Sequence, residues 1–327
     1  MTLSTVSGYL EPSLDKVREM ISDSLRSDIS LLNATNDSLL AHPGKMMRPM
    51  LALLCARVCS GGRLTTDTYR CAAASQLLHT ATLLHDDVAD DGQSRRGEPT
   101  VLHMLGGRAS VLLGDYWLEK AMDRILDSDR HREEAIRLFA ATLGHLADGE
   151  MLQLQKASTG DTTEADYYRI IYCKTASLFE SSAVSGALSV NASEESITAV
   201  RSYAKYLGLA FQIKDDLFDY EPGAQVGKPV GQDLMEQKIT LPLLGALANA
   251  PEDEAAAVRQ KVVKIGEDPS LREEIVDFVG RYMGMEYAEA RLLDHVDRAI
   301  SFLSIFPEGK DRDCLEALAR ISAERKL

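Results

Sequence analysis

The chain has 327 residues, 45% of them hydrophobic, and its 50 acidic residues against 36 basic ones give a formal net charge of −14. Such an excess of negative charge disfavours nucleic acid and anionic membrane surfaces as partners. The apolar content supports a large core, and the few prolines and β-branched runs favour long helices over sheet. The prediction is an all-α protein with a single domain over residues 1–327.

The ends and the cysteines bear on location. Residues 1–15 lack a basic stretch followed by an apolar one, and no run reaches the roughly 18 apolar residues of a spanning helix. The five cysteines are odd in number and form no Cys-x-x-Cys pair, which is typical of thiols in a reducing compartment. The sequence therefore predicts no transmembrane segment and a cytoplasmic location.

Basic residues beside glycine and proline are the first chemical signal along the chain. Lys45 and Arg48 lie in the segment Gly44-Lys45-Met46-Met47-Arg48-Pro49. The arginine fork donates two hydrogen bonds in register to a diphosphate, and lysine supplies a point charge. A lysine or arginine that is merely solvated at the surface does not need neighbouring glycine and proline residues. We therefore interpret both residues as candidates for phosphate binding.

A helix is predicted from Tyr69 to Asp91, where apolar residues recur with a helical period. His79, Asp86 and Asp90 fall on another stripe, because steps of seven and four residues return to nearly the same angle. The segment Asp86-Asp87-Val88-Ala89-Asp90 thus puts two carboxylates side by side with a third adjacent. Carboxylates at this spacing repel each other unless a cation lies between them.

A second motif repeats this spacing in Asp215-Asp216-Leu217-Phe218-Asp219, on a helix predicted from Leu207 to Tyr220. Gln212 shares the face of its first and last aspartates. Ligation by oxygen alone selects Mg²⁺ or Mn²⁺, and Mg²⁺ takes a few carboxylates and completes its shell with water and substrate phosphate. The two motifs together predict one bipartite site for divalent cations and a diphosphate substrate.

An acidic site for anionic substrates also needs cations. The segment 221–231 is too broken by glycine and proline for a helix and too long for a tight turn, so we interpret it as a loop that covers the site. The later candidate cations are Arg95 and Arg96 in the polar loop 91–100, Lys174 beside an apolar run, Lys228 in segment 221–231, and Lys238.

This series of segments resembles the trans-prenyltransferases, the polyprenyl diphosphate synthases of isoprenoid synthase type I, over about residues 40 to 245. The matching segments are Gly44-Lys45-x-x-Arg48-Pro49, His79 to Asp87, Arg95 to Thr100, Gly114-Asp115-Tyr116, Gly149-Glu150-x-x-Gln153, Lys174-Thr175-Ala176, Phe211-Gln212-x-x-Asp215-Asp216, Gly227-Lys228-Pro229 and Lys238-x-Thr240-Leu241-Pro242.

The resemblance implies an isoprenoid synthase-type helical bundle around a deep central cavity, usually a homodimer. Its implied activity is the head-to-tail condensation of isopentenyl diphosphate with an allylic diphosphate. Three Mg²⁺ ions, with Mn²⁺ able to substitute, would hold the allylic diphosphate among Asp86, Asp87, Asp90, Asp215, Asp216 and Asp219. By the same pattern Arg95, Lys174, Lys228 and Lys238 contact that diphosphate, Lys45, Arg48, His79 and Arg96 bind isopentenyl diphosphate, and Thr175 and Gln212 line the reacting centre.

Two departures from the family pattern stand out. Gln237 occupies a position where glycine commonly precedes the lysine. The C-terminal Glu324-Arg325-Lys326-Leu327 only partly resembles the basic tail that closes some short-chain members. The second departure bears on closure of the site and not on catalysis.

Two other kinds of protein share part of the pattern. A class I terpene cyclase carries the first motif, but normally has an Asn/Ser/Glu-type second motif and needs no isopentenyl diphosphate site. A non-catalytic subunit of a heteromeric synthase lacks one or both acidic motifs. The intact Asp215 motif argues against both.

Product length follows from the residues before Asp86. A chain held at that aspartate grows toward the helix N-terminus past Thr82 and Ala81, positions where bulky aromatic residues stop growth early in this family. Leu78 and Ser75 on the next turns are not aromatic either. The prediction is a product longer than farnesyl, with hexaprenyl to octaprenyl favoured and geranylgeranyl diphosphate as the alternative.

Overall fold

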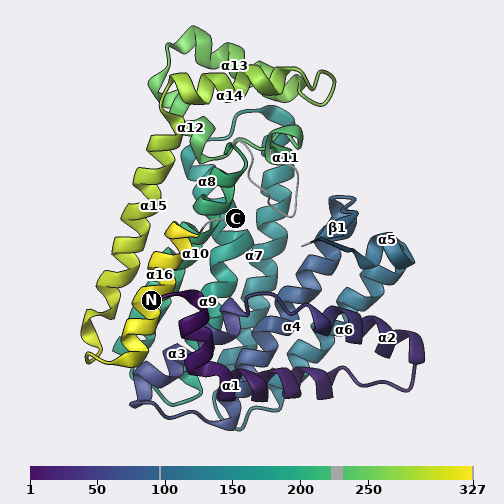
Figure 1. The fold of residues 1–327 in the computed structure, drawn as a ribbon, viewed down its shortest axis with the longest axis vertical. Helices are drawn as coiled ribbons and strands as arrows, with labels where there is room; N and C mark the ends of the chain where they lie inside the picture. Colours follow the sequence, from purple (N-terminus) through teal and green to yellow (C-terminus); the bar gives the residue numbers. More distant parts are fainter. Residues whose placement is uncertain (96, 222–230, 326–327) are drawn as a thin grey trace. The chain divides into compact units, whose positions relative to one another are not determined.

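A computed structural model describes residues 1–95, 97–221 and 231–325, and its regular structure is almost entirely helical (Figure 1). The elements are α1 (Leu3–Ser24), α2 (Ser30–Ala41), α3 (Met47–Ser60), α4 (Thr66–Ala89), β1 (Ser94–Arg95), β2 (Glu98–Pro99), α5 (Val101–Leu105), α6 (Gly107–Leu126), α7 (Arg132–Thr159), α8 (Glu164–Ile171), a π-helical turn (Tyr172–Ala176), α9 (Ser177–Leu188), α10 (Glu194–Phe218), α11 (Gln232–Met235), α12 (Leu241–Asn249), α13 (Glu252–Lys264), α14 (Leu271–Arg281), α15 (Gly284–Ser301), a 3₁₀ turn (Phe302–Ile305) and α16 (Lys310–Glu324).

The all-α prediction is confirmed. Within the described ranges the only strands are β1 and β2, which pair antiparallel with Ser94 opposite Pro99. They fall in the segment predicted as a polar loop, residues 91–100. In the part of the chain that is described, no helix has the length and apolar character needed to cross a membrane.

The contacts within the chain divide it into two compact units, and each unit contains several separate stretches of sequence. The first unit contains residues 1–141, 178–202 and 302–318, and the second contains residues 142–177, 203–301 and 319–327. The prediction of one domain stays a prediction.

Helix α4 carries the first acidic motif and begins with a capping box. The Thr65 hydroxyl accepts a hydrogen bond from the Thr68 backbone N–H at 3.2 Å, and the Thr68 hydroxyl accepts one from the Thr65 N–H at 3.1 Å. This arrangement satisfies N–H groups that have no partner within the helix. The helix therefore starts three residues before the predicted Tyr69, and it ends two residues before the predicted Asp91.

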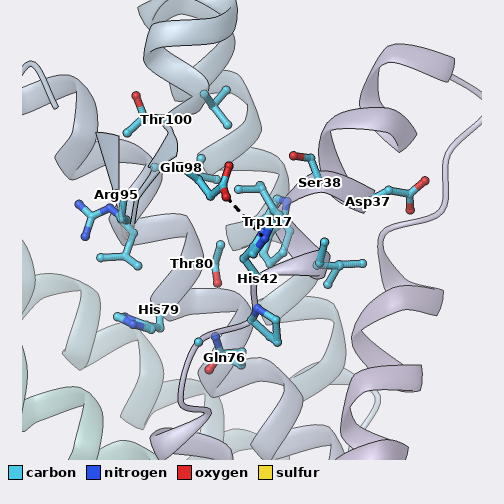
Figure 2. Close-up of a pocket in the computed structure, with 18 of the residues that line it drawn as sticks. Asp37, Ser38, His42, Gln76, His79, Thr80, Arg95, Glu98, Thr100 and Trp117 are labelled. Carbon is cyan, nitrogen blue, oxygen red and sulfur yellow. Dashed lines mark ion pairs between the residues drawn. The ribbon is translucent and has the colours of Figure 1, made fainter. Parts of the chain in front are cut away.

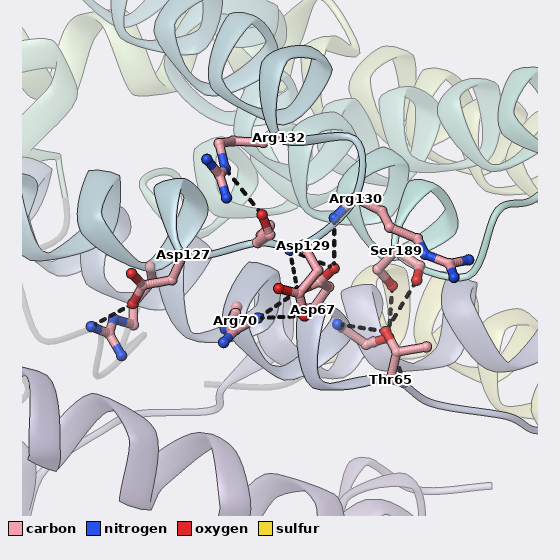
Figure 3. Close-up of polar contacts among 11 residues, drawn as sticks. Thr65, Asp67, Arg70, Asp127, Asp129, Arg130, Arg132 and Ser189 are labelled. Carbon is pink, nitrogen blue, oxygen red and sulfur yellow. Dashed lines mark hydrogen bonds and ion pairs between the residues drawn. The ribbon is translucent and has the colours of Figure 1, made fainter.

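A buried carboxylate ties the start of α4 to the turn between α6 and α7 (Figure 3). Asp67 accepts hydrogen bonds from the backbone N–H groups of Asp129 and Arg130, at 3.1 and 3.2 Å. Arg70, one turn along α4, pairs with it at 2.8 Å. Because the charge is compensated by these donors, Asp67 can be 5% exposed without a metal.

Close helix contacts in the first unit depend on a small residue. A Cβ at Gly186 of α9 would lie 2.2 Å from the Ala52 carbonyl oxygen of α3, so only glycine permits this approach. Helices α1 and α3 both pack on α4, and α6 packs along it. The buried residues of α3 include the run from Met50 to Ala56, which is hydrophobic on every face as expected for a central helix.

In the second unit, α12 packs against α14 and α15, and α13 lies beside α14 (Figure 1). Gly284 begins α15 where a Cβ would lie 2.1 Å from the Pro242 carbonyl oxygen of α12. Leu241, Leu243 and Leu244 fill the buried face of α12.

Candidate active site

The first acidic motif occupies the last turn of α4. Asp86 is half-buried, Asp90 is exposed and caps the helix, and Asp87 is only 5% exposed. A helix C-terminus carries a partial negative charge, so each acid there costs about 0.3–1 kcal/mol instead of stabilising the helix. No basic residue lies in the last turn of α4 to offset this cost. A cation bound at this motif would therefore offset the repulsion between the carboxylates and the helix dipole, and would stabilise the last turn of α4.

One carboxylate of the motif has a protein partner from the β hairpin. Arg95 donates from Nε and from a terminal nitrogen to the same Asp87 oxygen, at 3.0 and 2.7 Å. The predicted pairing of Arg95 with a substrate diphosphate thus starts from an arginine that is already oriented by Asp87. Arg96 lies outside the described residues.

A cavity of about 700 Å³ opens beside the motif within the first unit (Figure 2). His79 and Arg95 line one side of it, and Trp117 lies in its wall. His42 and Glu98 approach each other to 3.9 Å between the loop after α2 and strand β2. Most of the remaining lining is apolar, with leucines from α2 and α4 and methionines from α5 and the α2–α3 loop.

The structure brings part of the predicted isopentenyl diphosphate set to this cavity. His79 and the backbone at Gly44 line it. Lys45 is exposed next to Gly44, and Arg48 on α3 lies with its guanidinium 4.9 Å from the centre of the Phe179 ring. Lys45 and Arg48 do not line the cavity as described.

The second acidic motif occupies the last turn of α10, which also lacks a basic residue in that turn. Here the carboxylates are held by donors from elsewhere in the second unit. Asp216 is 3% exposed and accepts hydrogen bonds from the Tyr167 hydroxyl at 2.6 Å and from the Gln212 amide at 2.9 Å. Asp219 accepts from the backbone N–H groups of Gly231 and Gln232, at 2.8 and 3.0 Å.

An arginine near the C-terminus completes this environment. Arg325 donates to Asp215 at 2.7 Å and to the Phe211 carbonyl at 2.6 Å, and its guanidinium stacks 3.8 Å from the Phe211 ring centre. The Arg325 side chain is 12% exposed, and burial lowers its pKa from the usual value. The partly matched C-terminal tail therefore reaches the second motif.

Burial makes the second motif electrostatically costly. It raises the pKa of Asp216 to about 8 and that of Asp219 to about 6, and in both cases the nearby charge of Asp233 adds to the shift. Asp233 also lies 3.7 Å from Lys238, which pairs with Glu236 as well. Lys238, which is predicted to contact the diphosphate, thus lies between two carboxylates of the protein, Asp233 and Glu236.

Lys174 and Thr175 lie in the π-helical turn, a feature frequent at functional sites. The Lys174 ammonium lies 2.5 Å from a Glu150 oxygen and donates to Gln153 at 3.1 Å. The Thr175 hydroxyl donates to the Gln212 amide oxygen at 2.7 Å. The predicted reacting-centre pair Thr175 and Gln212 is therefore in direct contact. Lys228 lies outside the described residues.

The donor chemistry fits a hard divalent cation. Both motifs present carboxylate oxygens at a helix C-terminus, and Asp219 Oδ2 is buried with no hydrogen-bond partner among the described residues. Among the residues that are described, no three acidic, histidine or cysteine side chains converge in a metal-binding cluster. Bound cations would therefore be held by each motif together with substrate oxygens or water.

Sequence reasoning missed three residues of this site, Tyr167, Asp233 and Arg325. Tyr167 and Arg325 reach the second motif from distant parts of the chain. No local pattern marks Tyr167, and the only signal for Arg325 was the partial match of the C-terminal tail. Asp233 had one available signal, since it lies five residues before the predicted Lys238.

Comparison with known proteins identifies the family of the chain. A family profile described as polyprenyl synthetase matches residues 29–279. The chain is 33% identical over 326 residues to an octaprenyl diphosphate synthase of Haemophilus influenzae, covering 99% of this chain and 98% of that protein. It superimposes with a TM-score of 0.91 and 32% identity on a decaprenyl diphosphate synthase of Rhodobacter capsulatus, over 100% of both chains.

A polyprenyl synthase of Caulobacter crescentus, solved in complex with calcium and isoprenyl diphosphate, gives a TM-score of 0.91 at 31% identity and covers 100% of this chain and 98% of that one. The predicted family and fold class are thereby confirmed. The chain belongs to the polyprenyl synthetase family.

Proposed function

We propose that this protein is a Mg²⁺-dependent long-chain trans-polyprenyl diphosphate synthase. It condenses isopentenyl diphosphate with an allylic diphosphate, releases diphosphate and makes a product longer than farnesyl, in the hexaprenyl to octaprenyl range. The observation that carries the proposal is the pair of aspartate-rich motifs, each at a helix C-terminus, in a chain of this family. The octaprenyl and decaprenyl products named for its relatives support the long chain.

Binding of the allylic diphosphate is assigned to the acidic motifs and the cations fixed beside them. Arg95 is oriented by Asp87, and Lys174 by Glu150 and Gln153. Such groups need little reorganisation to meet substrate oxygens. The calcium bound in the Caulobacter crescentus relative supports a divalent cation, and three Mg²⁺ ions with Mn²⁺ as a substitute belong to the same proposal.

The reaction begins with cleavage of the allylic carbon–oxygen bond. Bound divalent cations supply charge that stabilises the departing diphosphate. Lys174 and Lys238 add fixed positive charge, while Thr175 and Gln212 orient groups at the reacting centre without introducing a base. Isopentenyl diphosphate attacks the allylic cation through its double bond, and the proton lost afterwards passes to the released diphosphate.

Product length is assigned to the face of α4 beneath Asp86. Thr82 is half-buried, one turn before that aspartate, and its hydroxyl donates to the His79 carbonyl at 2.8 Å. Ala81 is 1% exposed, so it packs in the core of the first unit. Since successive helical residues differ by about 100° in direction, Thr82 lies nearer the Asp86 face than Ala81 does. Thr82 is therefore the better position for controlling chain growth.

A homodimer belongs to the same proposal. Met104 and Leu105 on α5 and Leu112 on α6 are 47%, 42% and 60% exposed. Exposed large apolar side chains on neighbouring helices are common at sites of self-association. The cytoplasmic location stays a prediction from the sequence.

One incubation tests the proposed function against its alternatives. The purified chain alone receives isopentenyl diphosphate, farnesyl diphosphate and Mg²⁺, and the products are separated by chromatography. Polyprenyl diphosphates of 30 to 40 carbons are expected. A product that stops at 20 carbons would favour the geranylgeranyl alternative, a cyclic hydrocarbon would indicate a terpene cyclase, and no turnover would indicate a subunit that needs a partner.

A further inference from the structure

We propose that His85 is a positioning residue for the first acidic motif, which it holds in place by anchoring the last turn of α4 to α6. The inference rests on the proposed function, because the motif's role in holding a divalent cation and diphosphate is part of that function.

The contact joins two helices that run side by side in the first unit (Figure 1). His85 Nε2 lies 3.2 Å from the Val111 carbonyl oxygen and 3.2 Å from a carboxylate oxygen of Asp115. One residue earlier, the Leu84 carbonyl accepts a hydrogen bond from the buried Ser110 hydroxyl at 2.8 Å. Two consecutive residues of α4 are thus bonded to α6 immediately before Asp86.

The ring fits only because α6 has a glycine opposite it. A Cβ at Gly114 would lie 2.3 Å from His85 Nε2 and 2.5 Å from Cδ2, far inside any tolerable contact. The backbone at Gly114 is helical, so its conformation does not demand glycine. The requirement for glycine therefore comes from the His85 imidazole.

The position of this anchor matters for the carboxylates. Helix ends fray, and Asp86 and Asp90 lie in the last turn of α4, where the helix dipole and their mutual repulsion both oppose order. A metal and diphosphate site tolerates displacements of about 0.5 Å. A side chain bonded to a neighbouring helix just before that turn restricts its rotation and fraying.

His85 does not itself face the substrate with the motif. It is one residue from Asp86, so its side chain leaves the helix about 100° away from that carboxylate. Its Nε2 is already directed at α6. It therefore acts through Asp86 and Asp90, and its loss should affect the metal site more than the isopentenyl diphosphate site.

The test measures Mn²⁺ affinity by electron paramagnetic resonance in the presence of inorganic pyrophosphate, together with KM for each substrate. His85→Ala should weaken Mn²⁺ binding at least tenfold and leave KM for isopentenyl diphosphate within about twofold. His85→Gln, which keeps an N–H donor of similar reach, should restore most of the affinity. Unchanged Mn²⁺ affinity in His85→Ala would overturn the inference.

Gly114 supplies a second, independent perturbation. Gly114→Ala should displace the imidazole and reproduce the loss of Mn²⁺ affinity, whereas adding it to His85→Ala should cause no further loss, because the clash is gone. Gly144→Ala is the matched control, since no atom of the described residues lies within 4 Å of the Cβ position at that helical glycine, and the variant should bind Mn²⁺ as the wild type does.

The double variant also covers a failure to fold, because it removes the clash and replaces a helical glycine by a better helix former. A further tenfold loss in the double variant would show that Gly114 acts independently of His85, and would overturn the coupling. Failure of the wild-type protein to bind Mn²⁺ with pyrophosphate would instead count against the proposed function, so the two failures are distinguishable.

Discussion

The two acidic motifs have the same spacing but different surroundings. In the first, Asp87 is fixed by Arg95, while Asp86 is half-buried and Asp90 exposed. In the second, Asp216 and Asp219 are buried and fixed by hydroxyl, amide and backbone donors. The donors to Asp87 in the first motif thus come from the β hairpin, whereas the donors to Asp216 and Asp219 in the second come from α8, α10 and the start of α11.

The two motifs also differ in the size of the residue that precedes each by one helical turn. Thr82 precedes Asp86 by four residues, and Phe211 precedes Asp215 by four. The Phe211 ring is covered by Arg325, whereas Thr82 is small and half-buried. Identical acidic spacing therefore occurs in two local settings, one preceded by a small, half-buried residue and one by an aromatic ring on which an arginine stacks.

Removing the first aspartate of either motif should have the largest effect. Asp86→Ala and Asp215→Ala should each lower kcat by at least about a thousandfold, because each removes charge that holds a cation against the departing diphosphate. Steady-state assays at saturating Mg²⁺ measure this directly. Near-wild-type turnover in one variant alone would show that the two motifs are not equivalent in catalysis.

A variant of Arg325 tests whether the stacked arginine matters to the reaction. Arg325→Ala removes a charged hydrogen bond worth about 1.5–3 kcal/mol, so kcat/KM for the allylic substrate should fall by about 10- to 150-fold. Arg320→Ala is the matched control, because Arg320 is exposed on α16. Equal activity in the two variants would show that the contact with Asp215 is incidental.

Giving the first motif the aromatic neighbour of the second should change the product more than the rate. Thr82→Phe places a ring one turn below Asp86, and we expect a shift to shorter products while the first condensation proceeds at a similar rate. Chromatography of the products and the initial rate with farnesyl diphosphate provide the two readouts. Ala81→Phe should also shorten the product, and because Ala81 is buried, overpacking of the core is a competing effect there. An unchanged distribution in an active Thr82→Phe variant would place the growing chain elsewhere.

The second unit contains a buried histidine, His295, whose protonation should lower the stability of the fold at acidic pH. Burial lowers the pKa of His295 to about 4, while the opposite charge of Asp294 raises it and the positive charges of Arg298, Arg291 and Lys205 lower it further. In the unfolded chain this histidine binds a proton below its ordinary pKa of about 6.5, whereas in the folded protein it stays neutral until about pH 4. The folded state is therefore not penalised by His295 above pH 6.5, and it loses stability as the pH falls from 6.5 to 4.

His295→Phe should therefore flatten the fall in melting temperature between pH 6.5 and 4 relative to the wild type. The ring lies between Tyr168 and Tyr206, and its two nitrogens have no hydrogen-bond partner in the described part of the chain, so an apolar ring of similar size is a reasonable replacement. Parallel melting curves for the two proteins across this pH range would contradict the assigned pKa.

Local patterns predicted that each acidic motif lies on a helix, and this is confirmed. The helix from Tyr69 to Asp91 corresponds to α4, because apolar period and acidic spacing are properties of one segment. The start at Thr66 depends on a reciprocal bond between two threonines, which periodicity alone does not reveal. The predicted helix from Leu207 was only the second half of α10.

The partners of the carboxylates could not be predicted in the same way. Tyr167 is 49 residues from Asp216, and Arg325 bonds the Phe211 carbonyl across 114 residues, so both contacts arise from tertiary packing. Nor does acidity identify function by itself. Asp67, at the other end of α4, is a buried carboxylate whose donors satisfy it as part of the fold.

The smallest expected effect concerns Gln237, where the family commonly has glycine. The residue has a φ of +60°, a left-handed conformation that favours glycine, and its side chain donates to the Val263 carbonyl at 2.6 Å. Both Gln237→Gly and Gln237→Ala remove that hydrogen bond, but only alanine retains a Cβ in the left-handed conformation. Gln237→Gly should therefore be more stable than Gln237→Ala by about 1 kcal/mol in denaturant unfolding, after the greater flexibility of glycine in the unfolded chain is offset. If alanine were equally stable, the positive φ would carry no strain, and the departure from glycine next to Lys238 would need no compensating hydrogen bond.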